Sequence, residues 1–293
     1  MDQLPTQIVN GLMLGGVYAL IAVAFNLIFG VLRIVYFAHG QVMMVGAYVG
    51  LAVLLTLHNV AFALIAAALV AAVVGLFMER VVVRPLLGQH HLMPLVSTVS
   101  AGVIMEEVVR LAVNHGQTVS YPESALAGFP NLSFGTVSFG AVQLLVLVIS
   151  VLLVLALGWV IRATWYGRAM RAVAQSPDIT AILGVNIPRT AAMTFAISSA
   201  LTGAGGVLFG LIYASFDPYF GEIIGIKALA VVLLGGLGSL GGAAAGGILL
   251  GLVEALAIGY LPTSWENAFA FGLMMVILLV RPGGLAGSAQ RVD

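Results

Sequence analysis

The sequence has little charge and no cysteine. Lys, Arg, Asp and Glu together make up only 8% of its 293 residues, whereas a soluble domain averages about 25%, so the chain cannot cover a water-facing surface. Without cysteine, disulfide and thiolate chemistry are excluded. The formal net charge is zero, which removes the electrostatic argument for nucleic acid as a partner. This composition predicts a protein whose surroundings are the lipid bilayer.

Motifs for catalysis and energy supply are also missing. The only lysine, Lys227, is followed by alanine rather than Ser or Thr, so no Walker A phosphate-binding loop exists. The sequence contains neither G-x-S-x-G nor H-E-x-x-H, and its histidines show no metal-ligand spacing. We therefore expect a protein that is not an enzyme and holds no cofactor or metal, so that any ATP hydrolysis belongs to another subunit.

Long apolar runs are what the sequence has instead. Hydrophobic residues make up 61% of the chain, and about 20 apolar residues suffice to cross a bilayer. The seventh run is short, and the glycine-dense stretch 235–247 follows it, which predicts a broken element and a sharp turn near 225–247. We expect an all-α, polytopic transmembrane helical bundle of about eight or nine membrane segments. The runs are approximately 8–32, 35–57, 60–83, 92–112, 138–161, 190–214, 225–236, 242–260 and 265–280.

Glycine pairs four residues apart recur within these runs. This spacing places both glycines on one helix face, where a neighbouring backbone can approach closely, so the pairs predict tight packing within a bundle. The pairs are Gly11/Gly15, Gly46/Gly50, Gly206/Gly210, Gly221/Gly225, Gly242/Gly246 and Gly247/Gly251.

The distribution of basic residues predicts an orientation. With the N-terminus outside and nine crossings, nine of the eleven basic residues fall at the inner side, and only Arg110 and Lys227 fall at the outer side. Because short cytoplasmic loops are rich in Lys and Arg, we expect the N-terminus outside, the C-terminus cytoplasmic, and the loop 162–189 in the cytoplasm.

The loop 162–189 also carries a short helix signal. Ser176 is suited to an N-cap, Pro177 to the first helical position, and Gly184 to the residue that ends a helix. A presented helix of this kind can dock to a soluble partner. An amphipathic linker that its arginines hold to anionic lipid is the alternative.

Ionisable residues inside the apolar runs are candidate sites, because burying a charge in hydrocarbon is costly. Glu254 is compatible with a packed polar contact or with a residue of the transport pathway. The spacing of Glu106 and Arg110 allows them to pair along one helix face. Together with Glu107, these carboxylates are also compatible with ion-coupled transport.

The triplet His39-Gly40-Gln41 opens the second run, after the basic residue Arg33. We place it at the cytoplasmic side of the second span, where it forms either a tight turn under the bundle or a constriction of the pathway.

Three separated blocks resemble a known family. Residues 10–50, with Tyr36-Phe37-Ala38-His39-Gly40-Gln41 inside them, the loop 167–187, and the stretch 233–256 are similar, in the same order, to permeases of branched-chain amino acid ABC importers. Gln41 replaces an acidic residue common in that family, which puts in doubt a role that needs a carboxylate there. Val185 replaces the usual isoleucine and keeps its bulk.

The resemblance implies an ABC importer permease fold, with residues 1–293 as a single transmembrane permease domain in the cytoplasmic (inner) membrane. It implies a permease that moves amino acids, branched-chain ones in the first place, or related small solutes. The implied partners are two ATP-binding cassette subunits, a second homologous permease or a second copy of this chain, and an extracytoplasmic substrate-binding protein.

By the same resemblance, residues 176–183 are a coupling helix that seats in an ATP-binding subunit. Its implied coupling residues are Arg168, Arg171, Ser176, Pro177, Asp178, Ala181, Leu183 and Gly184. The candidate pathway residues are His39, Gly40, Gln41 and Glu254.

Two other functions remain as alternatives. An ion-coupled secondary transporter would use Glu254, or Glu106 with Glu107, and its uptake would follow an ion gradient and ignore ATP depletion. A passive channel for a small neutral solute such as urea would conduct as the purified chain alone.

Overall fold

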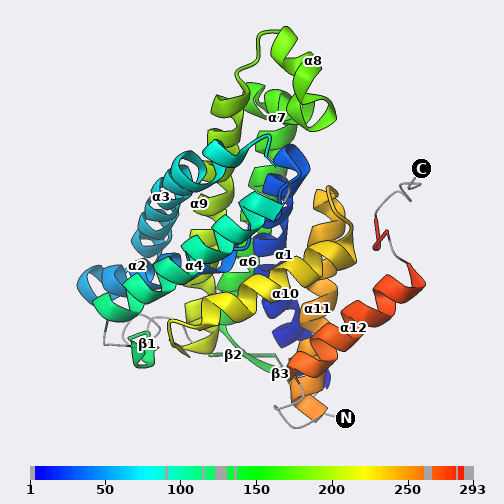
Figure 1. Cartoon of the computed structure of the whole chain (residues 1–293). Helices are drawn as coiled ribbons and strands as arrows, with labels where there is room; N and C mark the ends of the chain where they lie inside the picture. The colour runs from blue at the N-terminus through cyan, green and yellow to red at the C-terminus, as the bar shows by residue number, and fades with distance from the viewer. Residues whose placement is uncertain are drawn as a thin grey trace.

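The computed structural model describes residues 4–89, 92–113, 116–122, 131–134, 137–260, 266–281 and 283–286. Nearly all of this is helix (Figure 1). The helices are α1 (Leu4–Leu32), α2 (His39–Leu57), α3 (Val60–Met78), the π-helix η1 (Glu79–Val83), the 3-10 helix η2 (Arg84–Leu86), α4 (Leu92–Ala112), α6 (Ala141–Ala163), α7 (Trp165–Gln175), α8 (Pro177–Ile182), α9 (Ile187–Tyr213), α10 (Phe220–Gly235), α11 (Leu240–Tyr260) and α12 (Glu266–Val280).

Seven helices in the described residues are long and apolar enough to cross a membrane: α1, α2, α3 with its η1–η2 extension, α4, α6, α9 and α11. Two further apolar helices, α10 and α12, are shorter, with 16 and 15 residues. The polytopic all-α bundle predicted from the apolar runs is therefore confirmed. The short seventh run belongs to α10, which begins earlier than its apolar run and crosses the bundle obliquely (Figure 1).

Helix α1 lies in the middle of the bundle. In its most apolar window 89% of the residues are buried, against 22% for α3 and for α6, and its neighbours are α11, α9, α6 and α10. Its glycines allow this enclosure, because a side chain at Gly11 or Gly15 would collide with the backbone of α11 at Leu252 or Ile248. The predicted role of these glycines in close helix packing is confirmed.

A second close crossing joins α2 to α9. A side chain on Gly46 would collide with the backbone of Gly203, and one on Gly206 would collide with the carbonyl oxygen of Met43. The two helix backbones therefore touch along this crossing, which holds the start of α2 in a fixed position against α9.

Helix α2 begins inside the bundle, so the predicted tight turn under the bundle is wrong, while the predicted cytoplasmic side stays a prediction. The His39 ring packs edge-on against Phe25 of α1, with centroids 5.4 Å apart, and its Nε2 lies 2.8 Å from Oγ1 of Thr202 in α9. Because a helix rises about 1.5 Å per residue, Phe25 lies about 10 Å inside the Leu32 end of α1. Residues 33–38 thus run back into the protein without helix, which membrane depth permits only where protein encloses the backbone.

The sharp turn predicted in the glycine-dense stretch is present, but it is shorter than expected. Gly236 and Gly238, with φ of 103° and 84°, form the turn between α10 and α11, conformations that favour glycine. Asn26 of α1 fixes this turn, since its Oδ1 accepts from the Gly238 N–H at 2.8 Å and its Nδ2 donates to the Ser239 carbonyl at 2.8 Å. The glycines from 241 onward lie within α11, because close packing there outweighs their low helix propensity.

Short strands lie at the end of the molecule away from α8 (Figure 1). Strand β1 (Val119–Ser120) pairs antiparallel with β4 (Ser215–Phe216), and β2 (Asn131–Phe134) pairs antiparallel with β3 (Val137–Gly140). Tyr121 joins this end to the bundle by donating a hydrogen bond to the Ala47 carbonyl at 2.9 Å, and burial raises the pKa of its phenol.

Candidate functional site

The sequence signals at residues 176–184 do produce a separate short helix, α8. The Ser176 Oγ accepts from the Ile179 N–H at 3.5 Å, and Pro177 occupies the first helical position. Asp178 lies in the first turn, where a negative charge is favourable. Gly184, with φ of 83°, takes the left-handed conformation that ends the helix.

One face of α8 is fixed to α7 and the other is exposed. The buried Thr180 hydroxyl shares a hydrogen bond between the carbonyl oxygens of Ala172 in α7 and Ser176, at 2.9 and 2.7 Å. On the opposite side Ile179, Ile182 and Leu183 have exposed fractions of 60%, 85% and 75%. The hairpin of α7 and α8 projects beyond the rest of the molecule, away from the N-terminus (Figure 1). A rigid helix therefore presents an apolar tip.

The basic residues of the loop flank α8 rather than form part of it. Arg168 and Arg171 both lie on α7 and both are exposed. The Arg171 guanidinium donates to the Ile161 carbonyl at the end of α6, so this residue anchors α7 to the last turn of a membrane-length helix. Ala181 and Leu183 lie at the exposed end of α8.

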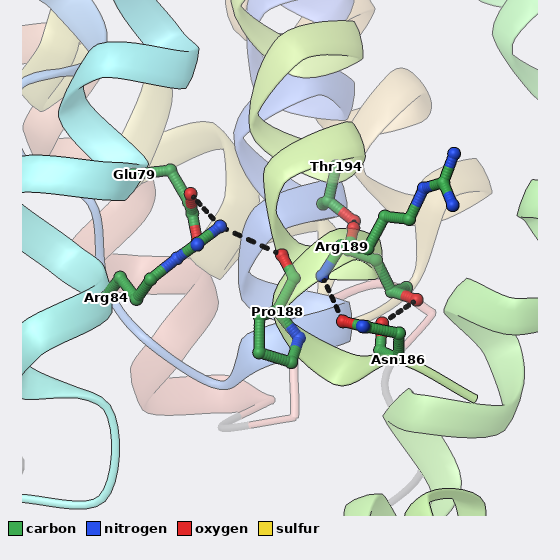
Figure 2. Close-up of polar contacts among 7 residues, drawn as sticks. Glu79, Arg84, Asn186, Pro188, Arg189 and Thr194 are labelled. Carbon is green, nitrogen blue, oxygen red and sulfur yellow. Dashed lines mark hydrogen bonds and ion pairs between the residues drawn. The ribbon is translucent and has the colours of Figure 1, made fainter. Parts of the chain in front are cut away.

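An ion pair at the base of the hairpin joins α9 to the end of α3 (Figure 2). Glu79 is 1% exposed, and Arg84 donates to its two carboxylate oxygens at 3.0 and 2.9 Å. The same guanidinium donates to the Pro188 carbonyl at 3.4 Å, in the first turn of α9. Asn186 caps this turn by accepting from the Arg189 N–H at 2.9 Å (Figure 2).

This clamp of Glu79, Arg84 and Pro188 is absent from the sequence predictions. The two charged residues are five apart, whereas side chains meet on an α-helix at spacings of three or four. The π-helix η1 changes that relation, since its hydrogen bonds join residues five apart and the Arg84 N–H bonds to the Glu79 carbonyl. The sequence shows only a Glu and an Arg at the polar end of an apolar run, and this pattern does not predict the π-helix that brings them together.

A second ion pair lies inside the bundle. Lys227 of α10 and Glu254 of α11 are 3% and 0% exposed, and Lys227 Nζ lies 2.6 Å from Glu254 Oε1. The Tyr18 hydroxyl of α1 donates to the same Oε1 at 3.1 Å. Glu254, predicted as a packed contact or a pathway residue, is thus part of a buried polar centre on three helices. The Lys227 side chain is enclosed in protein, and its predicted position towards the outer side stays a prediction.

The other candidate pathway residues have different neighbours from those of Glu254. They are His39, Gly40 and Gln41. His39 points to α9 through Thr202. Gly40 lies against Gly221 and Gly225 of α10, with no room for a side chain, while Gln41 faces α4 at Gly102. The candidate pathway residues are therefore divided between two places in the bundle. In the described part of the chain, no group of three His, Asp or Glu side chains could hold a metal ion.

A bundle of membrane-length helices with a buried polar centre and a projecting short helix is typical of a polytopic membrane protein. Residues 7–278 match the family described as branched-chain amino acid transport system / permease component. The chain belongs to this family.

Two relatives resemble the chain over nearly their whole length, and a third over less than half of it. The chain is 34% identical to the high-affinity branched-chain amino acid transport system permease protein LivH of Escherichia coli (strain K12) and 35% identical to the corresponding protein BraD of Pseudomonas aeruginosa. Each alignment covers 97% of this chain and 96% of the relative. An autoinducer 2 import system permease protein, LsrC of Klebsiella pneumoniae, is 30% identical over 47% of this chain and 42% of its own length.

Proposed function

We propose that residues 1–293 act as one permease domain of an ATP-driven importer in the cytoplasmic membrane. With a second permease, either a homologue or another copy of this chain, it would form the path for amino acids, branched-chain ones in the first place. Two ATP-binding cassette subunits would supply the energy, and an extracytoplasmic binding protein would deliver the substrate. The family and the naming of its relatives as transport system permeases support this assembly.

The exposed apolar tip of α8 is the observation that carries the proposal. Ile182 and Leu183 are 85% and 75% exposed, on a loop that the bias of basic residues places in the cytoplasm. A lipid-binding linker would instead present its arginines to the membrane surface. A capped, rigid helix with an apolar end suits a groove in a soluble partner, since its ordering is already achieved before docking. In this orientation the N-terminus is outside and the C-terminus cytoplasmic.

The clamp offers a route from the docking helix to the membrane helices. Movement of α8 reaches α9 through the four-residue connection 183–186, and Arg84 ties the first turn of α9 to the buried Glu79 at the end of α3. ATP binding and hydrolysis then bias the permease, provided that the ATP-binding subunits hold α8 differently in their two states. Neither an ion-coupled transporter nor a passive channel requires such a helix, and the family does not favour either.

The experiment is to change the tip of α8 and, separately, the charge of the loop. In the double variant Ile182→Asp with Leu183→Asp, we expect co-purified ATP-binding subunits and ATP-driven leucine uptake to fall at least tenfold. The matched control, Arg162→Ala with Arg189→Ala, removes two exposed charges of the loop and leaves the apolar tip, so we expect both readouts within twofold of wild type. The reverse pattern would support the lipid-bound linker and refute the proposed docking.

A further inference from the structure

The carboxylate of Glu106 is left without the basic partner that its spacing suggested. Arg110 forms its ion pair with Glu107, with Nε 2.7 Å from Oε2, and Glu106 is in none of the ion pairs found among the described residues. Glu106 lies in α4, partly enclosed by the neighbouring helices. A carboxylate at this depth is expensive unless it is paired, and it marks a candidate site by default.

The neighbour that Glu106 does have is Gln41. The Gln41 side chain is only 7% exposed and lies against α4, with its amide close to the Glu106 carboxyl. Since a carboxylate only accepts, the amide N–H₂ is the group that can donate to it. The amide oxygen Oε1 is then a second acceptor, and it is buried without any hydrogen-bond partner.

Helix α4 has a gap into which this amide fits. Gly102 is one helical turn before Glu106, so both lie on the same face of α4. A Cβ built on Gly102 would lie 3.1 Å from Gln41 Oε1 and 3.2 Å from its Cδ. The absent side chain therefore leaves the space that the amide oxygen occupies, one helical turn before Glu106 on the same face of α4.

Acidic side chains lie near Glu106, while the nearby Arg110 is paired with Glu107. The acidic side chains are Glu107 on the same helix, Asp217 in the segment before α10, and Glu222 in the first turn of α10. A carboxylate, an unpaired amide oxygen and an acidic surround attract a cation that can donate several hydrogen bonds. A primary ammonium has three N–H donors and no acceptor, whereas an anion or a carboxylate group would be repelled.

We propose that Glu106 and Gln41 Oε1 form a binding site for the ammonium group of the transported amino acid. This deepens the proposed function and rests on it for the identity of the substrate. In the proposed orientation the site lies near the outer end of α4, so an arriving amino acid meets it before the middle of the bilayer. An alkali cation is the competing occupant.

The test uses the assembled transporter in lipid nanodiscs and labels intramembrane carboxylates with dicyclohexylcarbodiimide, read out peptide by peptide by mass spectrometry. L-leucine and leucinol, which both carry the ammonium, should slow the labelling of Glu106 at least threefold. 4-Methylpentanoate, which keeps the carboxylate and lacks the ammonium, should not. In the Gln41→Leu variant the protection should disappear, and labelling of Glu107 should be the same with and without leucine.

Each other outcome overturns the site. Three of these outcomes are no protection by leucine, equal protection of Glu106 and Glu107, and no reaction of Glu106 at all. The fourth is protection by sodium chloride as strong as that by leucine, with none by choline chloride, which would indicate an alkali cation as the occupant. Gly102→Ala, which crowds the Gln41 amide without removing it, should weaken the protection by leucine. Because labelling needs no ATP-driven uptake, its result stands whether or not the chain proves to be an importer subunit.

A transport measurement completes the test. In proteoliposomes of the whole transporter we expect Glu106→Gln to lower leucine uptake at least tenfold with ATP hydrolysis within twofold, and the matched variant Glu107→Gln to stay within twofold in both. Full uptake by Glu106→Gln would overturn the site, whereas a wild type without ATP-driven uptake would count against the proposed function alone.

Discussion

The interior of the bundle buries polar side chains, whereas the tip of α8 exposes apolar ones. Inside, Lys227, Glu254 and Tyr18 are buried and bonded to one another across three helices. At the tip, Ile182 and Leu183 are apolar and exposed on a polar, projecting hairpin. The difference teaches which interactions the chain completes by itself and which it leaves to another molecule. Substitutions in the two regions should therefore separate folding from assembly.

The largest effect should come from breaking the buried ion pair. Lys227→Met leaves the Glu254 carboxylate buried without its cation, a change that typically destabilises by about 3–5 kcal/mol. The double variant Lys227→Met with Glu254→Met should recover most of this loss, since replacing both ions of a buried pair is often neutral. The measurement is the thermal unfolding of the purified permease in detergent. A double variant as unstable as the single one would refute the role of the pair.

A smaller and local effect is expected where α8 meets α7. Thr180→Val removes the hydroxyl shared between the Ala172 and Ser176 carbonyls, which should cost the hairpin about 1 kcal/mol. Hydrogen exchange of residues 177–183 should accelerate, while the unfolding temperature of the bundle stays unchanged. Thr190→Val, which removes a similar hydroxyl from the first turn of α9, is the control, and it should leave exchange in α8 as it is. A loss of bundle stability in Thr180→Val would erase the distinction between the two regions.

The smallest effect on stability is expected at the exposed ion pair of Arg110 with Glu107, which we compare with the buried pair of Lys227 with Glu254. Arg110 and Glu107 are 32% and 52% exposed, so solvent screens their attraction, and such pairs contribute about 0–1 kcal/mol. Arg110→Ala should therefore change the stability of the permease by less than about 0.5 kcal/mol. The same unfolding measurement checks this. A loss comparable to that of Lys227→Met would show that α4 depends on this pair.

Local chemistry explains which features could be predicted from the sequence. The apolar runs indicated the helices, and the ends of α8 followed from Ser176, Pro177 and Gly184, because caps act between residues a few positions apart. The pairing of Lys227 with Glu254 could not be predicted in this way, since the two residues lie on different helices and only packing brings them together. The partner of Arg110 was mistaken for Glu106, because spacings of three and four are both permitted on a helix.

Depth in the membrane was the other property that the sequence did not reveal. His39 follows a basic turn, which favoured a tight turn under the bundle, yet α2 starts next to Phe25 and Thr202. Hydrophobicity is similar for a segment that enters the bundle and one that lies under it, so the pattern cannot distinguish them. The same holds for Glu79, whose pairing with Arg84 depends on a π-helix that composition does not signal.

The enclosed position of α1 also sets an order for biogenesis. Tyr18 and Asn26 find their partners on residues 236 and 212 positions later in the chain. At about 5–20 residues per second of synthesis, α1 waits on the order of 10–50 s in the membrane before Glu254 and Gly238 exist. During that time its polar side chains must rest in lipid or on a temporary neighbour. The helices made last complete the surroundings of α1, so a chain interrupted before α11 would leave its central helix uncovered.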